Sequence, residues 1–237
     1  MSELKILFTD IETSPIEAYT WGIWQQNISL NQIIKPTHVL CYAAKWLDNK
    51  RVMFDSVHKY KGKDASKKML QTIHKLLDEA DVVCTYNGKA FDIKHLNREF
   101  LKHGMKPPSP YKQLDLLQVV KGQFKLPSNK LDYLSQYIGI GAKQAHEGFG
   151  LWVKCLAGDK AAWKIMELYN KKDVTLLEEL YYKLLPWIPK HPGRSTKEEC
   201  CPTCGGNHLQ KRGMATNKTG TYQRYQCTDC GSWSSGE

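Results

Sequence analysis

Hydrophobic and polar residues alternate along Leu4 to Thr13, LKILFTDIET, and this short apolar run predicts a buried β-strand. Ile6 and Phe8 share one face of that strand. Because strand side chains point alternately to the two faces, Asp10 and Glu12 continue the same row. A carboxylate on a core-facing row has to be paired, coordinated or neutralised, since burying a lone charge is costly. A surface turn after an edge strand is the simpler alternative.

The residues that follow alternate between strand-like and helical periods, which predicts an α/β fold. Strands are expected at 16–23, 37–46, 51–57 and 81–86, the first three as antiparallel neighbours of the opening strand. Helices are expected at 64–80, after Asp92, at 114–120, at 131–138 and at 159–185. The helix after Asp92 is expected to place Ile93, Leu96, Phe100 and Leu101 on one face. The segment 139–150 is expected to be a loop that holds a solvated His146.

Asp92 ends the segment NGKAFD, in which Gly88 predicts a tight turn from a strand into a helix. The aspartate therefore lies at or near the start of that helix. Its ordinary role there is to cap the helix or to interact with the helix dipole, which is worth about 1 kcal/mol.

The helix at 159–185 carries polar side chains on its apolar face. Tyr169 and Asp173 fall three or four residues from the leucines of this face, so both extend a core-facing stripe. Five polar neighbours are expected off that face: Asn170, Lys171, Lys172, Glu178 and Glu179. An inward tyrosine often only packs, whereas an aspartate without a partner in its own helix calls for a function.

Four acids thus stand at the ends of core elements: Asp10, Glu12, Asp92 and Asp173. Carboxylates without nearby cysteine or histidine suit hard cations such as Mg²⁺ or Mn²⁺. Two such ions, about 3.5–4 Å apart, can stabilise the attacking and leaving oxygens of a phosphoryl displacement. On a basic chain this chemistry indicates phosphodiester cleavage.

The segments DIE, NGKAFD and YNKKD resemble, in this order, the three motifs of the DnaQ-like 3′–5′ exonucleases. The histidine branch of that family has its base five residues before the last aspartate, where this chain has Leu168. Tyr169 stands four before it, so the chain resembles the tyrosine (DEDDy) branch, over roughly residues 4–185. It is also similar to stand-alone exonucleases of bacteria and phages that are related to the proofreading domain of family-B polymerases. The resemblance implies an RNase H-like mixed sheet flanked by helices.

The resemblance also implies a role for each matching residue. Asp10, Glu12 and Asp173 would hold one metal ion, Asp10 would bridge to the second, and Asp92 would support that second ion. Tyr169 would orient the attacking water, because a phenol with a pKa near 10 is a poor base. The positions expected to contact the terminal nucleotide are Thr13, Asn87, Gly88 and Phe91. Phe91 would either stack on a base or pack in the core.

The net charge and the distribution of apolar residues limit the kinds of binding partner that we expect. A formal charge of +10 favours a polyanion, with nucleic acid ahead of an anionic membrane. No signal peptide is visible, and no apolar run approaches the ~18 residues that span a bilayer. We therefore expect a soluble, cytoplasmic protein without membrane contact, acting in the host cytoplasm if a phage encodes it.

Five of the eight cysteines fall within 200–237, and this spacing predicts a metal site. Two CxxCG segments, 22 residues apart, supply Cys201, Cys204, Cys227 and Cys230 for one structural Zn²⁺. Cys200 and His208 are the alternative ligands. Cys41, Cys84 and Cys155 are expected to be ordinary core residues. We therefore divide the chain into an exonuclease domain at 1–188, a linker at 189–199 and a zinc ribbon at 200–237.

The predicted ribbon mixes basic and aromatic residues, as nucleic-acid surfaces do. They are Lys211, Arg212, Lys218 and Arg224 with Tyr222, Tyr225 and Trp233. A protein-docking ribbon, for a polymerase or another replication protein acting in trans, and a purely structural cap are the alternatives.

The sequence therefore favours a two-metal 3′–5′ exonuclease acting on DNA. The same fold acting on RNA is the first alternative, because 2′-OH discrimination depends on pocket shape. Cutting of branched DNA and a non-catalytic nucleic-acid-binding scaffold are the others, although a scaffold has no need of four mutually repelling carboxylates.

Overall fold

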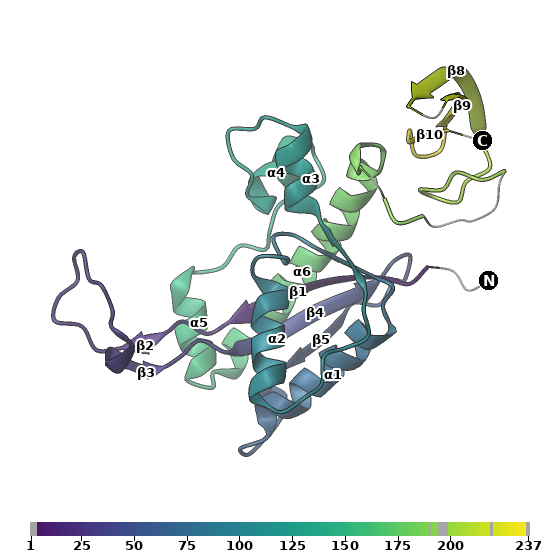
Figure 1. Cartoon of the computed structure of the whole chain (residues 1–237). Helices are drawn as coiled ribbons and strands as arrows, with labels where there is room; N and C mark the ends of the chain where they lie inside the picture. The colour runs from purple at the N-terminus through teal and green to yellow at the C-terminus, as the bar shows by residue number, and fades with distance from the viewer. Residues whose placement is uncertain (1–3, 190, 194–198, 219, 236–237) are drawn as a thin grey trace.

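A five-stranded mixed sheet forms the centre of the computed structural model, which describes residues 4–189, 191–193, 199–218 and 220–235 (Figure 1). The strands follow the order β5 (Met53–Ser56), β4 (Val39–Trp46), β1 (Ile6–Thr13), β6 (Val82–Thr85) and β7 (Lys112–Asp115). β1, β4 and β5 pair antiparallel, whereas β6 and β7 extend the sheet in parallel with β1. The predicted α/β fold with a mixed sheet is confirmed.

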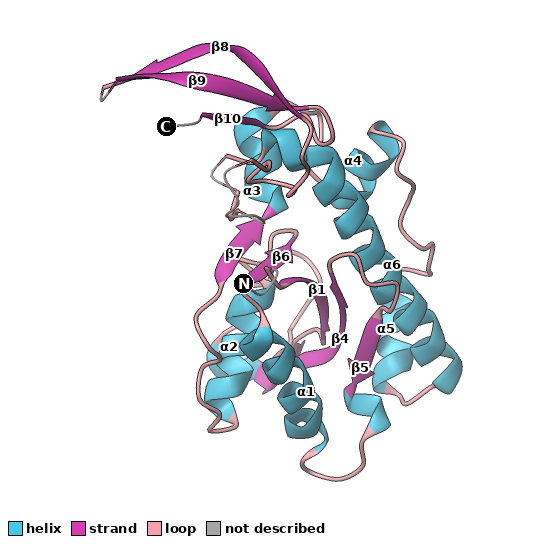
Figure 2. Ribbon diagram, turned by 90° about the vertical axis from the view of Figure 1, so that its right-hand side faces the viewer, coloured by secondary structure: helices cyan, strands magenta, loops and turns pink. Residues whose placement is uncertain are grey.

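Helices cover both faces of this sheet, as Figure 2 shows. On one face lie α1 (Ala65–Glu79) and α2 (Asp92–Lys102), which pack on Leu7 and Ile11 of β1. On the other lie α3 (Leu116–Gln123), α4 (Leu131–Tyr137) and α6 (Lys160–Leu184), which pack on Ile6 and Phe8. The period-two alternation of β1 therefore sends its even-numbered side chains towards α6.

Two helix starts have a clear local cause. The Asp159 carboxylate accepts the amides of Ala161 (2.7 Å) and Ala162 (3.2 Å) and so begins α6. Asp115, the last residue of β7, accepts the amide of Leu117 (3.1 Å) and begins α3. The helix expected from residue 114 therefore starts two residues later, after a strand that the apolar pattern did not reveal.

The prediction for 16–23 was wrong. Its only strand is β2 (Glu17–Ala18), which pairs with β3 (Ile33–Lys35) in a separate two-stranded sheet. The 3₁₀ turn η1 (Leu30–Gln32) leads into β3. The β-forming residues that suggested a strand beside β1 are exposed, and Trp21 is completely exposed.

Two further expectations fail. The helix α5 (Phe149–Leu156) begins where only a loop was expected. Leu101 is 81% exposed, because α2 buries its other apolar residues against α1 and β4 and turns this one to solvent. The three isolated cysteines are buried core residues, as predicted: Cys41, Cys84 and Cys155.

The C-terminal segment forms a three-stranded antiparallel sheet of β8 (Leu209–Asn217), β9 (Gly220–Cys227) and β10 (Trp233–Ser235). It touches the 3₁₀ turn η3 (Leu185–Trp187), where Ser232 Oγ donates to the carbonyl of Leu185 over 3.4 Å. Much of the predicted linker, at 190 and 194–198, lies outside the described residues. Within the described ranges, no helix is both long and apolar enough to span a bilayer.

Candidate active site

Three of the predicted acids meet between β1 and α6. Carboxylate oxygens of Asp10, Glu12 and Asp173 all lie within 4.8 Å of one another. Asp10 and Glu12 reach this point because they continue the row of β1 that faces α6. Asp173 is buried in the middle of α6. We call these three residues together with Asp92 the acidic cluster.

Asp92 joins this cluster from the first turn of α2. Its Oδ1 accepts the amide of Ile11 over 3.1 Å, which ties the start of α2 to the strand between Asp10 and Glu12. The N-cap position itself is Phe91, so Asp92 does not cap the helix, but it lies in the first turn, where the alternative interaction with the helix dipole places it.

Asn170 is a site residue that the helical pattern misplaced. Its side chain is fully buried, and Nδ2 donates to Asp10 Oδ2 over 2.6 Å. The prediction that Asn170 and Glu178 lie off the core face was wrong, because α6 is enclosed on more than one side. Glu178 is buried in an ion pair with Lys45.

Burial and mutual repulsion raise the pKa values of the carboxyl groups in the cluster. Burial, followed by the charges of the other three acids, raises the pKa of Asp10 well above its ordinary value. Burial and the Asp173 charge raise the pKa of Glu12 to about 8. Burial raises the pKa of Asp92 to about 7, against the opposing effect of its amide hydrogen bonds. An all-oxygen donor set that repels itself fits a divalent hard cation.

Lys143 supplies a positive charge that sequence reasoning missed. Its ammonium group forms an ion pair with Asp173 and donates to the Tyr169 hydroxyl over 3.2 Å. Burial acts to lower the pKa of Lys143, but the charges of Asp173 and Tyr169 outweigh it and raise the pKa above its ordinary value. Lys143 lies in the segment expected to be a plain loop, where a single lysine carries no recognisable pattern.

Tyr169 is largely buried one turn before Asp173. Burial, and then the Asp173 and Glu12 charges, raise the pKa of its phenol. The ring of His146 lies 4.7 Å from that of Tyr169, so this histidine packs beside the tyrosine. A phenol that is harder to ionise than usual is suited to orient a water rather than to deprotonate it.

A cleft of about 440 Å³ opens beside Asp10 and Lys143. The tight turn after β6 forms one wall, and Asp115 fixes it by accepting the amides of Asn87 (2.8 Å) and Lys89 (3.2 Å). Gly88 is required there, because a Cβ would lie 2.4 Å from the Thr85 side chain.

The remaining residues predicted to contact the substrate are Phe91 and Thr13. Phe91 is 40% exposed and its ring contacts His95, so it is not a core residue. Thr13, the last residue of β1, is half-buried. Its contact with a nucleotide, like those of the other three residues, stays a prediction.

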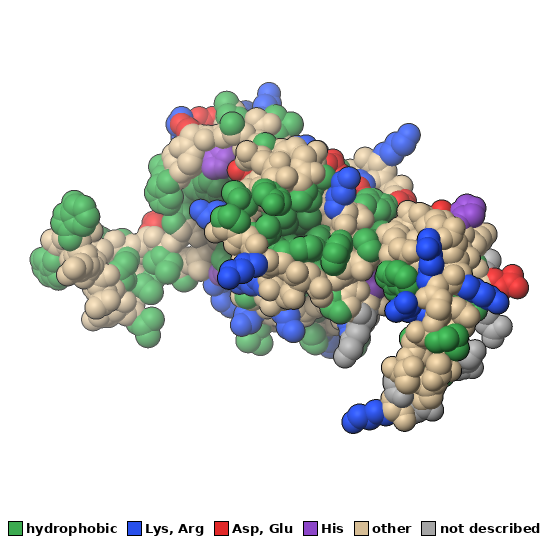
Figure 3. All heavy atoms as spheres, turned by 90° about the horizontal axis from the view of Figure 1, so that it is seen from above, with side chains coloured by type: hydrophobic (Ala, Val, Ile, Leu, Met, Phe, Trp, Pro, Cys, Tyr) green, Lys and Arg blue, Asp and Glu red, His purple; other side chains and the backbone are tan. Residues whose placement is uncertain are grey.

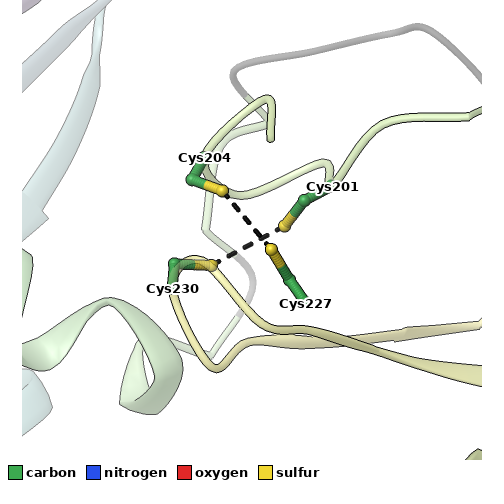
Figure 4. A group of neighbouring side chains, drawn as sticks. All are labelled: Cys201, Cys204, Cys227 and Cys230. Atoms are coloured by element: carbon green, nitrogen blue, oxygen red, sulfur yellow. Dashed lines mark hydrogen bonds between the residues drawn. The ribbon is translucent and has the colours of Figure 1, made fainter. Parts of the chain in front are cut away.

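A second cluster lies at the end of β9 and in the turns before β8 and β10, and we call it the cysteine cluster: Cys201, Cys204, Cys227 and Cys230 (Figure 4). The Sγ atoms of Cys201 and Cys230 lie 3.7 Å apart, as do those of Cys204 and Cys227. A tetrahedral Zn²⁺ with Zn–S bonds of about 2.3 Å requires sulfurs about 3.8 Å apart, so the residues fit this ion. Both knuckles close through a left-handed glycine, Gly205 (φ 78°) and Gly231 (φ 77°).

The alternative ligands lie outside this cluster. Cys200 donates to Asn207 over 3.0 Å, and His208 pairs with Asp229 over 2.7 Å. Of the predicted nucleic-acid surface, Arg224 lies over the ring of Trp233 at 4.8 Å.

The mixed sheet and the carboxylates that meet beside its first strand define an α/β domain of the nuclease type. Residues 7–185 match the model of the RNase_H superfamily, and the chain belongs to this superfamily. Membership supports a nuclease function and a nucleic-acid substrate.

The structure is similar to that of the family B DNA polymerase from the hyperthermophilic archaeon Pyrobaculum calidifontis, with a TM-score of 0.58 and 18% sequence identity. The match covers 78% of this chain and 25% of the polymerase chain, so it concerns the fold of one part of that protein. No curated protein matches the sequence.

Proposed function

We propose that the chain is a metal-dependent 3′–5′ exonuclease that hydrolyses single-stranded DNA or the 3′ ends of DNA. The observation that carries this proposal is the convergence of Asp10, Glu12 and Asp173, whose carboxylate oxygens lie within 4.8 Å of one another. The 3′–5′ polarity rests on the resemblance of the three motifs to the DEDDy exonucleases. DNA is preferred to RNA because the structurally similar protein is a DNA polymerase.

Two Mg²⁺ or Mn²⁺ ions held by the acidic cluster would supply an activated water and stabilise the leaving oxygen. The protein's own side chains position this chemistry. Asn170 fixes one oxygen of Asp10, which leaves the other for a bridging role. Tyr169 orients the attacking water, and its raised pKa agrees with a phenol that remains protonated. The cleft beside Asn87 receives the terminal nucleotide, with Thr13, Gly88 and Phe91 as further contacts.

The C-terminal segment has a supporting role in this proposal. The cysteine cluster holds one structural Zn²⁺, and the basic and aromatic side chains of the surrounding ribbon bind nucleic acid. The division into an exonuclease domain (1–188), a linker (189–199) and a ribbon (200–237) is part of the proposal. A polymerase or another replication protein acting in trans is the proposed protein partner.

A time course on 5′-labelled single-stranded DNA and RNA of one sequence, with Mn²⁺ or Mg²⁺, tests the proposal. We expect a ladder that shortens from the 3′ end, with DNA cleaved faster, and no ladder with Asp173→Ala. Glu167→Ala is the matched control, because this glutamate lies on the same helix, in a half-buried ion pair with Lys171 and outside the acidic cluster. Faster cleavage of RNA would make the chain an exoribonuclease. Internal cuts in a flapped duplex would make it an endonuclease, and tight binding without cleavage would make it a scaffold.

A further inference from the structure

An arm formed by residues 14–37 leaves the end of β1 and returns at the start of β4 (Figure 1). The β2–β3 pair forms its stem, and residues 21–31 are exposed throughout. Figure 1 shows the arm extending past α5, away from α1 and α2. This arm contains the segment 16–23, which was predicted to be a strand beside β1.

The exposed end of the arm combines aromatic rings with carboxamides. Tyr19, Trp21 and Trp24 are 75%, 100% and 79% exposed, and they fall within six residues. Exposed carboxamides follow at Gln25, Gln26, Asn27 and Asn31. The only charged residues of the arm, Glu17 and Lys35, neutralise each other over 2.9 Å. On a chain with a net charge of +10, this neutral end contrasts with the lysines and arginines elsewhere on the surface (Figure 3).

The root of the arm is fixed at the edge of the candidate active site. Ser14, two residues after Glu12, donates its amide to the carbonyl of His38 over 2.8 Å. The Thr37 hydroxyl donates to the carbonyl of Ser14 over 2.7 Å, and Arg98 donates to the carbonyl of Thr37 over 2.8 Å. Trp21 is nine residues from Glu12 in the sequence, so the chain between them spans at most about 30 Å.

We propose that this arm binds the bases of the single strand whose 3′ end lies in the cleft, an inference that rests on the proposed function. The rings of Tyr19, Trp21 and Trp24 stack on successive bases, and the carboxamides donate to and accept from base edges. The phosphates stay in solvent or on basic residues elsewhere, because the arm offers no free cation.

This chemistry has a signature that separates it from phosphate binding. Affinity that depends on neutralised phosphates falls with salt, in proportion to the number of contacts. Stacking neutralises no phosphate, so removal of the rings has to weaken binding without changing the salt dependence. Stacking also needs bases, so the arm should not increase the affinity for an abasic oligonucleotide of equal length and charge.

The test uses the full chain with Asp10→Asn, which we expect to bind without cleaving, and fluorescence anisotropy with a labelled 15-mer of thymidine. Combining Trp21→Ala with Trp24→Ala should raise the Kd by about thirtyfold or more, since each of the two stacked bases contributes about 1–3 kcal/mol. The slope of log Kd against log salt should stay unchanged. Trp21→Phe with Trp24→Phe keeps two rings and should restore most of the affinity.

An abasic 15-mer should bind equally well to the chain with and without the tryptophans. If the chains with and without the two tryptophans bound the thymidine 15-mer with equal affinity, the proposal would be overturned. So would a tryptophan effect that persists on the abasic strand, or a concentration-dependent self-association that the same substitutions abolish. The last outcome would make the arm a protein-docking element. None of these measurements requires cleavage, so they fail or succeed independently of the exonuclease assay.

Discussion

The acidic cluster and the cysteine cluster are both suited to metal ions, but they depend on the rest of the protein in opposite ways. The acids are held by β1, α2 and α6, which are packed in the main core, and Lys143 supplies a cation of the protein itself. Within the described part of 200–237, the buried side chains are those of Cys201, Thr203, Cys227 and Ser232. The first site is therefore a scaffold that exists before its ions bind. The second has almost no apolar core, so its ion has to supply most of the folding free energy.

The largest expected effect is the loss of the ribbon on removal of zinc. Combining Cys201→Ser with Cys227→Ser should unfold β8–β10, because zinc binding in such modules contributes on the order of 10 kcal/mol. Hydrogen exchange should then show unprotected amides at 209–235 and unchanged protection in the main sheet. Cys200→Ser, which lies outside the cluster, is the control. Protected ribbon amides in the double variant would refute the dependence on the ion.

Substitution in the acidic cluster should have the opposite effect, with loss of activity and no loss of the fold. Asp10→Asn should lower kcat by about a thousandfold or more, equivalent to about 4 kcal/mol of transition-state stabilisation, while Tm stays the same or rises. Single-turnover cleavage and calorimetry measure the two quantities. Glu79→Gln, an exposed site on α1, should change neither. A collapse in Tm would mean that the carboxylate is part of the scaffold.

Lys143→Met tests the internal cation. Without the lysine, the buried Asp173 lacks its partner, so the protein free of added Mg²⁺ or Mn²⁺ should lose about 2 kcal/mol of stability. The rise in Tm on addition of Mn²⁺ should become larger, because the ion no longer competes with the lysine. Lys154→Met removes an exposed pair with Glu147 and should leave the stability almost unchanged. An unchanged response to Mn²⁺ would show that Lys143 does not compete for the site.

The stability of the metal-free acidic cluster should also depend on pH. The folded-state pKa values of Glu12, about 8, and Asp92, about 7, lie above those of unfolded carboxylates, so the folded state binds more protons. This stabilisation is complete below about pH 4 and is lost as the pH rises through 7 and 8. The slope is at most about 1.4 kcal/mol per pH unit for each extra proton. In zinc-loaded protein without Mg²⁺ or Mn²⁺, Glu12→Gln removes the group with the pKa of about 8 and should flatten this decline in urea unfolding between pH 6 and 8. A parallel decline of the unfolding free energy with pH in the variant and the unsubstituted protein would contradict this prediction.

Local patterns predicted the parts of the site that belong to regular elements. The alternation in β1 placed Asp10 and Glu12 on one face, and the helical spacing of Tyr169 and Asp173 placed both inwards. The same spacing misplaced Asn170, because a helix buried on several sides has no single apolar stripe. Lys143 was missed because its contacts with α6 arise from a loop, whose path depends on tertiary packing.

The arm shows the converse error. Isoleucine, tyrosine and tryptophan favour strands because they pack well on a half-buried surface. In 16–24 those residues have no such surface within the described chain, and they remain exposed. A pattern of apolar residues in a sequence indicates which side chains gain from burial. It does not distinguish burial in a protein core from burial against a binding partner.

The contact of Gly231 with η3, the turn that directly follows α6, has a consequence for distance. A Cβ on Gly231 would lie 3.5 Å from Pro186, so the second CxxCG knuckle lies next to the turn that follows the helix carrying Asp173. Eleven residues separate Asp173 from Leu184, which at 1.5 Å per residue gives a stiff spacer of about 16 Å. If the ribbon binds a strand that is cleaved at the acidic cluster, the length of this spacer determines how much of the strand stays uncut. Digestion should then stop at a remnant of uniform length.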